Sequence, residues 1–182
     1  MTVPKIHRNG VMPQENLHPA ALEVDRLLAQ CSVRRLRRSG PGGQHRNKVE
    51  TAVVVTHTPT EIEGQASERR SQEQNRRMAI FRLRINLALQ LRRPPSPGSS
   101  PSQLWRSRCV GGRLAVSATH EDFPSLLAEA LDTLHAHQMD IQLAAELLQC
   151  SVSQLTKFLK LEPKAMQQLN VHRSQVGLRP LR

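Results

Sequence analysis

The first half of the chain carries three short segments with the hydrophobic pattern of β-strands. Residues 31–38 alternate roughly between two faces, although arginines interrupt the alternation. Residues 52–58 have the strongest β-propensity of the chain and stop at Pro59, which cannot donate a hydrogen bond to a neighbouring strand. Residues 60–66 follow a turn and form another extended piece. We therefore expect a small mixed β-sheet.

A helical period replaces this pattern after residue 70. Ser71 and Gln74 have the spacing of a capping box, in which a hydroxyl and an amide three residues later satisfy the free N–H groups of a helix start. From there to about residue 91 the apolar residues Met78, Phe81, Ile85 and Ala88 recur at helical spacing, with Ile80, Leu83, Leu87 and Leu91 widening the stripe. We expect this long helix to cover the sheet. The arginines expected to face solvent or RNA are Arg76, Arg77, Arg82, Arg84, Arg92 and Arg93.

The second half follows a Pro- and Ser-rich stretch that is too poor in apolar residues to pack. An irregular or short β segment containing Trp105 is expected up to about residue 119. Helical periods then predict helices near residues 124–137, 140–149, 153–161 and 163–170. The predicted organisation is α+β: an irregular leader (1–20), a sheet covered by a long helix (21–93), a linker (94–104) and a small all-α module (105–182).

Composition and charge point to a polyanionic partner. The 182 residues include 26 Lys and Arg against 15 Asp and Glu, a net charge of +11. Residues 1–93 hold 17 of these cations and 8 acids, whereas residues 94–182 hold 9 and 7. With no Tyr, one Trp and three Phe, base stacking on aromatic side chains is an unfavourable mode of recognition. The first half is therefore expected to contact phosphates, by shape and charge.

Other functional classes find little support in the sequence. The three cysteines are far apart and lack the paired spacing of a zinc site, so we interpret them as buried free thiols and predict no metal and no cofactor. No apolar run reaches the roughly 20 residues of a membrane span, and the first 30 residues lack the apolar core of a signal peptide. These features favour a cytoplasmic protein and leave an organellar origin open; we expect the protein to be monomeric.

Residues 34–48 form the most unusual stretch of the chain. Three glycines and a proline lie among six cations with no acid between them, so no apolar face can form. Glycine permits positive φ and lets a ligand approach the main chain closely. Lys and Arg that neutralise phosphates supply most of the sequence-independent affinity for nucleic acids. The stretch is typical of an exposed loop that contacts a phosphate polymer.

This loop resembles the Gly-Gly-Gln (GGQ) loop of the peptide chain release factors and their shorter ribosome-rescue relatives. The resemblance rests on the sequence from Gly40 through Val53, on residues 56–62 and on residues 68–75, and it extends over about residues 30–92. It implies the release-factor GGQ-domain fold and hydrolysis of the ester between a nascent peptide and the P-site tRNA, in the peptidyl transferase centre of the large ribosomal subunit.

The resemblance also implies residue roles. The catalytic residues would be Gly42, Gly43 and Gln44: the N–H of Gln44 would stabilise developing oxyanion charge, its side chain would restrict which nucleophile attacks, and the glycines would aim that N–H. Gly40, Pro41 and Asn47 would brace the loop. The expected RNA-contacting residues are Arg34, Arg35, Arg37, Arg38, Arg46, Lys48, Arg69 and Arg70.

The short relatives act without a stop codon, and the sequence favours this class. Factors that read stop codons carry a large recognition domain before the loop, whereas only about 40 residues precede it here. The short relatives often end in a densely basic tail, but residues 171–182 hold only three arginines and one histidine. How this chain would sense an empty mRNA channel therefore stays open.

The second half offers an alternative function. Residues 140–161 resemble the helix-turn-helix of Fis-type DNA-binding domains, with Leu147, Leu155 and Leu159 as core residues and Gln149 at the turn position that usually holds glycine. Gln154, Thr156 and Lys157 are the side chains that could read bases. The alternatives are a non-catalytic nucleic-acid-binding protein, or a helical module that docks on the ribosome or tRNA or stabilises the first half.

Overall fold

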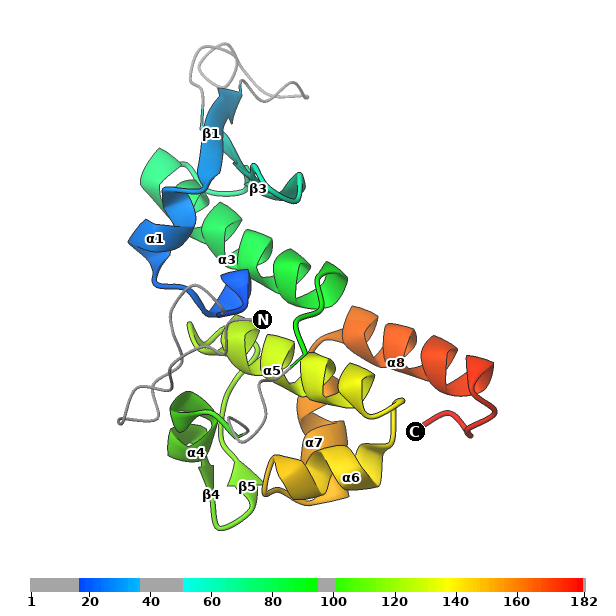
Figure 1. Ribbon diagram of the computed structural model, residues 1–182. Coiled ribbons are helices and arrows are strands. Elements are labelled where there is room, and N and C mark those ends of the chain that lie inside the picture. The colour runs from blue at the N-terminus through cyan, green and yellow to red at the C-terminus, as the bar shows by residue number, and fades with distance from the viewer. Residues whose placement is uncertain (1–16, 37–50, 95–100, 182) are drawn as a thin grey trace, which may run out of the picture.

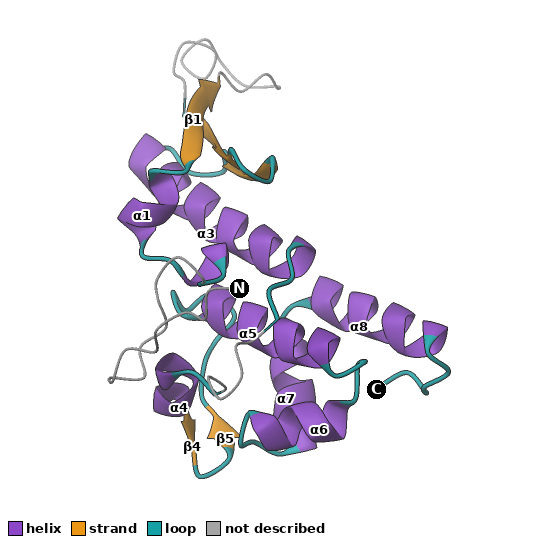
Figure 2. Ribbon diagram, viewed as in Figure 1, coloured by secondary structure: helices purple, strands orange, loops and turns teal. Residues whose placement is uncertain are grey.

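The computed structural model describes residues 17–36, 51–94 and 101–181, and its fold class is α+β as predicted (Figures 1 and 2). A small sheet lies at one end of the molecule, a long helix runs from it towards the centre, and the helices of the second half gather at the other end. The elements of the first half are η2 (Pro19–Ala21), α1 (Val24–Leu28), β1 (Cys31–Leu36), β2 (Ala52–His57), β3 (Ile62–Ala66) and α3 (Gln72–Gln90). Those of the second half are α4 (Gln103–Arg108), β4 (Cys109–Val110), β5 (Arg113–Leu114), α5 (Phe123–Ala136), α6 (Ile141–Leu147), α7 (Val152–Leu159) and α8 (Pro163–Gln175).

The sheet has the strand order β1-β2-β3, and both pairings are antiparallel. We expected a mixed sheet, so this detail is corrected. Residues 58–61 alone join β2 to β3, which is far shorter than the dozen or more residues that a parallel crossover requires. The strand β2 is buried at Val53, Val54 and Val55, as its composition predicted.

The long helix α3 starts as predicted, because the Ser71 hydroxyl accepts a hydrogen bond from the N–H of Gln74. It covers β2 and β3, and Ala79, Ile80, Leu83 and Leu87 of this helix are buried. The stripe led by Met78, Phe81 and Ile85 lies instead at the edge of this contact and is only half-buried. The helix is therefore rotated relative to the orientation that its sequence pattern suggested.

A single glycine sets the distance between β3 and α3. A Cβ atom on Gly64 would overlap the backbone oxygen of Ala79 and would lie 2.7 Å from the Cα of Leu83. No side chain fits in this space, so the strand can pack directly on the helix backbone only with glycine at position 64. This contact fixes the sheet on α3.

The two halves of the chain share one hydrophobic cluster, which runs from Val53 and Leu83 of the first half to Trp105 and Leu126 of the second. The second part of α3 packs against α5 and η2. The linker predicted for residues 94–104 ends earlier in the structure, because α4 already starts at Gln103. Helix α4 begins here because the Ser102 hydroxyl caps it by accepting from the N–H of Trp105.

Several polar groups close the junction between the halves. Arg84 donates to the backbone oxygens of Ala20 (2.9 Å) and Glu121 (3.1 Å) and to the Ser125 hydroxyl (2.9 Å). His18 is buried, and its Nδ1 accepts from the N–H of Ala20 at 3.0 Å. Burial lowers the pKa of His18 to about 4. These side chains hold η2 between α3 and α5.

A carboxyl group on α5 completes the junction. The side chain of Asp132 is buried and its Oδ1 accepts from the N–H of Arg93 at 3.0 Å. Burial raises the pKa of Asp132 to about 7, although this hydrogen bond and the cationic Arg92 act in the opposite direction. The first residues after α3 are therefore tied to α5 by a group that titrates near neutral pH.

The helical prediction for the second half is confirmed in outline and corrected in two places. Trp105 lies in α4 rather than in an irregular or β segment, while the short β segment is the hairpin β4–β5, whose Gly111 and Gly112 have positive φ. Helix α8 continues to Gln175, beyond the predicted end near residue 170. Arg173 anchors this extension, because its Nη1 donates to the backbone oxygen of Met139 at 2.7 Å.

The cysteines are free thiols, but all three are half-buried rather than buried as expected. Among the residues that the structure describes, no group of three or more His, Cys, Asp or Glu side chains is arranged to hold a metal ion. Across the same residues, no helix is both long and apolar enough to cross a membrane.

Candidate nucleic-acid interface

The predicted catalytic loop connects β1 to β2, and the structure describes the two points from which it departs. Leu36, the last residue of β1, pairs with Ala52, the first residue of β2. The loop therefore leaves and re-enters the sheet at neighbouring positions. The following predicted site residues lie outside the described residues: Arg37, Arg38, Gly40, Pro41, Gly42, Gly43, Gln44, Arg46, Asn47 and Lys48.

The strand that carries the loop stands outside the core. All residues of β1 after Cys31 are exposed, including Val33 and Leu36, which are 44% and 45% exposed. Its partner in the sheet is β2, whereas α3 packs chiefly on β2 and β3. Side chains on both faces of β1 are therefore accessible to a binding partner.

One buried side chain fastens the return of the loop. Asn75, in the first turn of α3, has an exposed fraction of 0%. Its Nδ2 donates to the backbone oxygen of Thr51 at 2.7 Å and to that of Arg69 at 2.9 Å. Its Oδ1 accepts from the N–H of Arg69 at 2.9 Å. Sequence reasoning missed this residue; the available signal was an asparagine, a poor helix former, immediately after a capping box.

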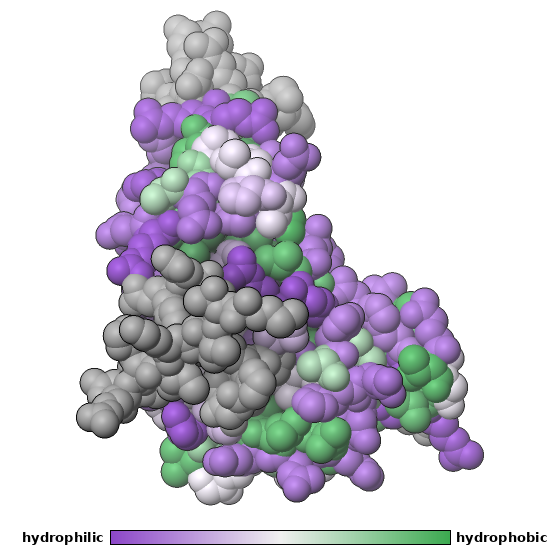
Figure 3. Space-filling view, viewed as in Figure 1, coloured by the Kyte–Doolittle hydropathy of each residue, from purple (hydrophilic) through white to green (hydrophobic). Residues whose placement is uncertain are grey.

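Exposed arginines surround this end of the sheet. Arg34 and Arg35 lie on β1, and Arg69 and Arg70 precede α3. Arg34 donates to Glu63 of β3 at 3.0 Å, with the two side chains 63% and 45% exposed. Arg35 lines a hollow of about 320 Å³ together with Arg76 of α3. In the view of Figure 3, hydrophilic side chains predominate around the sheet.

Four of the eight predicted RNA-contacting residues thus lie in the described part of the chain, and all four are exposed. They reach the surface from β1 and from the segment before α3, and Asn75 binds the backbone of both Thr51 and Arg69. The arrangement places positive charge beside the departure points of the loop. Such a surface can bind a phosphate backbone without reading sequence.

The first half of the chain is similar to a known family of proteins. Residues 23–103 match the family model described as the RF-1 domain. The chain is 43% identical over 82 residues to peptide chain release factor 1 of Acidiphilium cryptum (strain JF-5). It is 44% identical over 80 residues to peptide chain release factor 1 of Lactiplantibacillus plantarum. The chain carries a domain of the peptide chain release factor family.

The similarity to the release factors is limited to this domain. The alignments cover 44% and 43% of the chain but only 23% and 21% of the two relatives, so the chain spans less than a quarter of their length. No solved structure matches the chain. Helices α5 to α8 lie beyond the matched residues.

Two arginines of the release-factor domain that we expected at the surface or on RNA serve the fold instead. Arg84 is occupied by the junction contacts described above, and burial lowers its pKa. Arg92 donates to the backbone oxygens of Ala88, Leu89 and Leu91 at the end of α3. The sequence pattern could not distinguish them from Arg76 and Arg77. The acceptors of Arg84 come from segments that only the fold brings close, and the acceptors of Arg92 are carbonyl groups near the end of the helix, where the last turn leaves backbone oxygens without an intrahelical partner.

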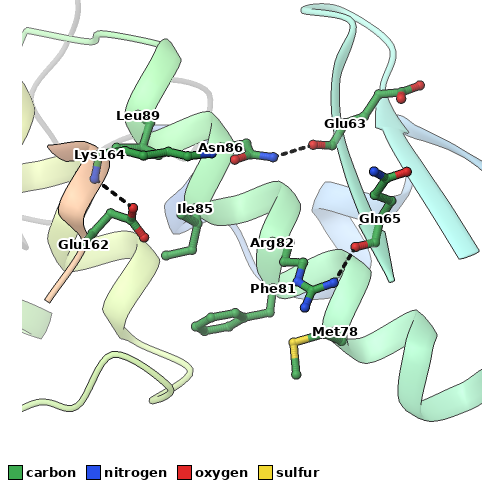
Figure 4. Close-up of a pocket in the computed structure, with 10 residues that line it drawn as sticks. All are labelled: Glu63, Gln65, Met78, Phe81, Arg82, Ile85, Asn86, Leu89, Glu162 and Lys164. Carbon is green, nitrogen blue, oxygen red and sulfur yellow. Dashed lines mark hydrogen bonds between the residues drawn. The ribbon is translucent and has the colours of Figure 1, made fainter. Parts of the chain in front are cut away.

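The half-buried stripe of α3 lines a second hollow, of about 560 Å³, which β3 and the residues Glu162 and Lys164 at the start of α8 also line (Figure 4). Met78, Phe81 and Ile85 form its apolar side. Arg82 and Asn86 donate to the backbone oxygens of Gln65 and Glu63, at 2.8 and 2.7 Å. These bonds occupy carbonyl groups of β3 that face away from β2, and so protect the free edge of the sheet.

The segment that resembles a helix-turn-helix has the predicted helices in shortened form, α6 and α7. Between them Gln149 has φ 53°, the left-handed conformation that favours glycine. The N–H groups of Gln149 and Cys150 bond to the oxygens of Glu146 and Ala145, which is the Schellman pattern of a helix end. Gln149 therefore adopts the conformation that glycine usually supplies at this turn position.

The core of the same segment is well formed, but few of the side chains that were predicted to read bases are exposed. Leu155, Phe158 and Leu159 of α7 are buried, and the indole of Trp105 donates to the backbone oxygen of Leu148 at 2.8 Å. Of the side chains predicted to read bases, Lys157 is exposed, while Gln154 and Thr156 are half-buried.

Proposed function

We propose that this protein hydrolyses the ester bond of peptidyl-tRNA on the ribosome without requiring a stop codon. Its partners would be the large ribosomal subunit and the P-site peptidyl-tRNA, and it would act as a monomer in the cytoplasm. The observation that carries the proposal is the match of residues 23–103 to the RF-1 domain, with about 43% identity to two proteins named peptide chain release factor 1.

The structure of the described residues supports a role on RNA. The loop departs from the outermost strand of the sheet, whose side chains are exposed, and arginines flank its base. The chain has a net charge of +11, concentrated in the half that carries the loop. No carboxylate is needed at this end of the molecule for the reaction that we propose.

In the proposed reaction, water attacks the carbonyl carbon of the ester. The bond from that carbon to the 3′-oxygen of the tRNA breaks, the peptide leaves as a carboxylic acid, and the 3′-oxygen takes up a proton. The backbone N–H of Gln44 would stabilise the negative charge that develops on oxygen, and its side chain would restrict the site to water. Gly42 and Gly43 would give the backbone freedom to aim that N–H. The ribosome and tRNA would supply the remaining groups.

The decisive experiment measures release of labelled peptide from ribosomes stalled on an mRNA that ends without a stop codon. The intact protein is compared at the same concentration with a Gly42→Ala/Gly43→Ala variant. We expect the variant to release peptide at least about 100-fold more slowly, comparable to the loss of one oxyanion-hole donor, because the N–H of Gln44 would be misdirected, while the affinity for ribosomes changes little. Equal rates for the two proteins, or binding without release by the intact protein, would exclude the hydrolase.

The codon-independent part of the proposal needs a second arm of the same assay. Ribosomes that display a stop codon, a sense codon or no codon in the A site are compared with one preparation of the protein. Release in the absence of a codon, at a rate equal to or above that with a stop codon, is expected. Release confined to the stop codon would keep the hydrolase but replace the rescue role with codon-dependent termination.

The second candidate function is binding of DNA through α6 and α7, and the Schellman turn at Gln149 is the observation that favours it. A Lys157→Ala/Lys160→Ala variant tests it, because both lysines are exposed on or next to α7. Loss of affinity for duplex DNA in the variant, with unchanged peptide release, would establish a separate activity of the second half. Equal and weak binding by both proteins would exclude it.

A further inference from the structure

We propose that Asn75 is the positioning residue of the catalytic loop. The inference deepens the proposed function and rests on it for its catalytic consequence. The geometry carries the positioning itself: a fully buried amide on α3 binds the backbone of Thr51, the residue directly before β2, and that of Arg69 before the helix. One side chain thereby joins the return of the loop, the segment with the predicted RNA contacts, and the helix that supports the sheet.

The chemistry of this position requires an amide. Nδ2 offers two protons, and both meet backbone oxygens, of Thr51 and Arg69. Oδ1 meets an N–H, that of Arg69. An aspartate of the same shape could still accept from Arg69 but would place a carboxylate oxygen against two carbonyl oxygens. A leucine would satisfy none of the three backbone groups.

The bond to Thr51 bears on the loop for a geometric reason. The Leu36–Ala52 pair closes the sheet ladder at the base of the loop, and Thr51 is the first residue beyond it on the β2 side. The contact at 2.7 Å therefore fixes the direction in which the chain leaves the ladder. A displacement of about 1 Å in a group that positions reactants is enough to reduce a rate about 100-fold.

The junction at the other end of α3 supplies a matched control. Arg84 also makes three hydrogen bonds from one side chain, two of them to backbone oxygens, and it lies on the face of the helix towards Ala20 and Ser125. An Arg84→Leu variant should therefore lose a comparable set of contacts without touching the loop. Asn75→Asp and Arg84→Leu are compared at a temperature at which unfolding curves show both to be folded.

The first readout is the dependence of peptide release on protein concentration with stalled ribosomes. For Asn75→Asp we expect the rate at saturating protein to fall at least about tenfold, while the concentration for half-maximal release changes less than about threefold. For Arg84→Leu both values should stay within about threefold of the intact protein. A parallel decrease in the two variants, or an unchanged maximal rate in Asn75→Asp, would overturn the inference.

The second readout separates the inference from the proposed function. Trypsin cleavage after Arg46 and Lys48 is timed for the free proteins, with no ribosome present. Cleavage in Asn75→Asp should be several-fold faster than in Arg84→Leu and in the intact protein. If the intact protein releases no peptide, the proposed function fails, and the cleavage rates alone decide whether Asn75 holds the loop: equal rates in the three proteins would overturn that claim.

Discussion

The two ends of α3 use similar residues for opposite purposes. At its start, Arg76 and Arg77 are exposed, Arg76 lines a hollow with Arg35 of the loop-bearing strand, and one buried amide, Asn75, binds the chain that returns from the loop. At its other end, Arg84 and Arg92 are withdrawn from solvent and donate to backbone oxygens. The helix therefore presents charge at the end where a polyanion would bind and uses charge to join the second half at the other.

This difference explains why arginine content alone is a poor guide to an RNA surface. Guanidinium groups have five donors in a fixed planar array, which suits them equally to phosphates and to clusters of backbone oxygens. Which use prevails depends on whether neighbouring segments bring acceptors close. At the junction η2 and the start of α5 do so through Ala20, Glu121 and Ser125.

The contact between β3 and the middle of α3 supports both ends of the helix. Breaking this contact should cause the largest loss in the free energy of unfolding. Gly64→Ala would force a Cβ against the backbone of Ala79 and Leu83, which no rotamer change can relieve. We expect a loss of more than about 3 kcal/mol in the free energy of unfolding, enough to prevent folding of the sheet. Circular dichroism and denaturant unfolding measure it.

The hairpin of the second half provides the control for this substitution. Gly112 has φ 74°, but no atom lies within 4 Å of the position that its Cβ would take. Gly112→Ala should cost only the strain of the left-handed conformation, about 1 kcal/mol. Similar losses for the two variants would show that β3 does not rest directly on the backbone of α3.

The next effect concerns the junction. Arg84→Leu removes three hydrogen bonds from a charged donor and leaves their acceptors without it, so we expect a loss of about 2 to 3 kcal/mol in the free energy of unfolding. Arg77→Leu, at a side chain that is 79% exposed and pairs with Glu73 at 3.1 Å, should change it by less than about 0.5 kcal/mol. A small effect of Arg84→Leu would mean that the remaining contacts of the junction, including the bond from Arg93 N–H to Asp132, hold the halves together without Arg84.

The sequence predicted the elements of the first half well because their signals are local. The β-branched run before Pro59 became β2, and the capping box at Ser71 became the start of α3. The helix rotation was missed because apolar residues surround much of α3, so the choice between Met78 and Ala79 as core depended on where β3 could approach. Gly64 decided that, and its role is visible only when strand and helix are placed together.

The candidate site was predictable to a different degree. The resemblance gave the loop and its arginines from a linear motif, and the four described arginines lie at the surface. Asn75 could not be assigned, because its partners Thr51 and Arg69 are brought together by the fold rather than by helical spacing. Trp105 was misplaced for a similar reason: its burial depends on Leu148 and Phe158, which lie more than forty positions later.

The junction should also respond to pH through His18. Because the pKa is about 4 in the folded protein and about 6.5 in an unfolded chain, the unfolded state binds more protons between these values. The stabilisation by neutral His18 is complete above pH 6.5 and is lost as the pH falls towards 4. Relative to His18→Asn, which keeps an acceptor for the N–H of Ala20, the intact protein should lose about 2 kcal/mol between pH 7 and pH 5.

The effect of His18 has to be measured as a difference between the intact protein and His18→Asn, because Asp132 also titrates in this pH range. The pKa of Asp132 is raised to about 7, so the folded state binds the extra proton and stability falls as the pH rises from about 4 to 7. This trend opposes that of His18. Because Asp132 is present in both the intact protein and His18→Asn, its contribution cancels when their free energies of unfolding are subtracted. If the difference in the free energy of unfolding between the intact protein and His18→Asn were the same at pH 7 and pH 5, His18 would be protonated in the folded state at pH 5.

The smallest effect on the free energy of unfolding is expected for substitutions on the exposed strand β1. Arg34 pairs with Glu63 across two largely exposed side chains, so Arg34→Gln/Arg35→Gln should change the free energy of unfolding by less than about 0.5 kcal/mol. If the two side chains contact phosphates, the salt dependence of ribosome affinity should decrease by about one unit of slope for each. Arg106→Gln, at an exposed arginine of α4 on the other side of the molecule, should leave that slope unchanged. Equal slopes for the intact protein and the β1 variant would remove Arg34 and Arg35 from the RNA surface.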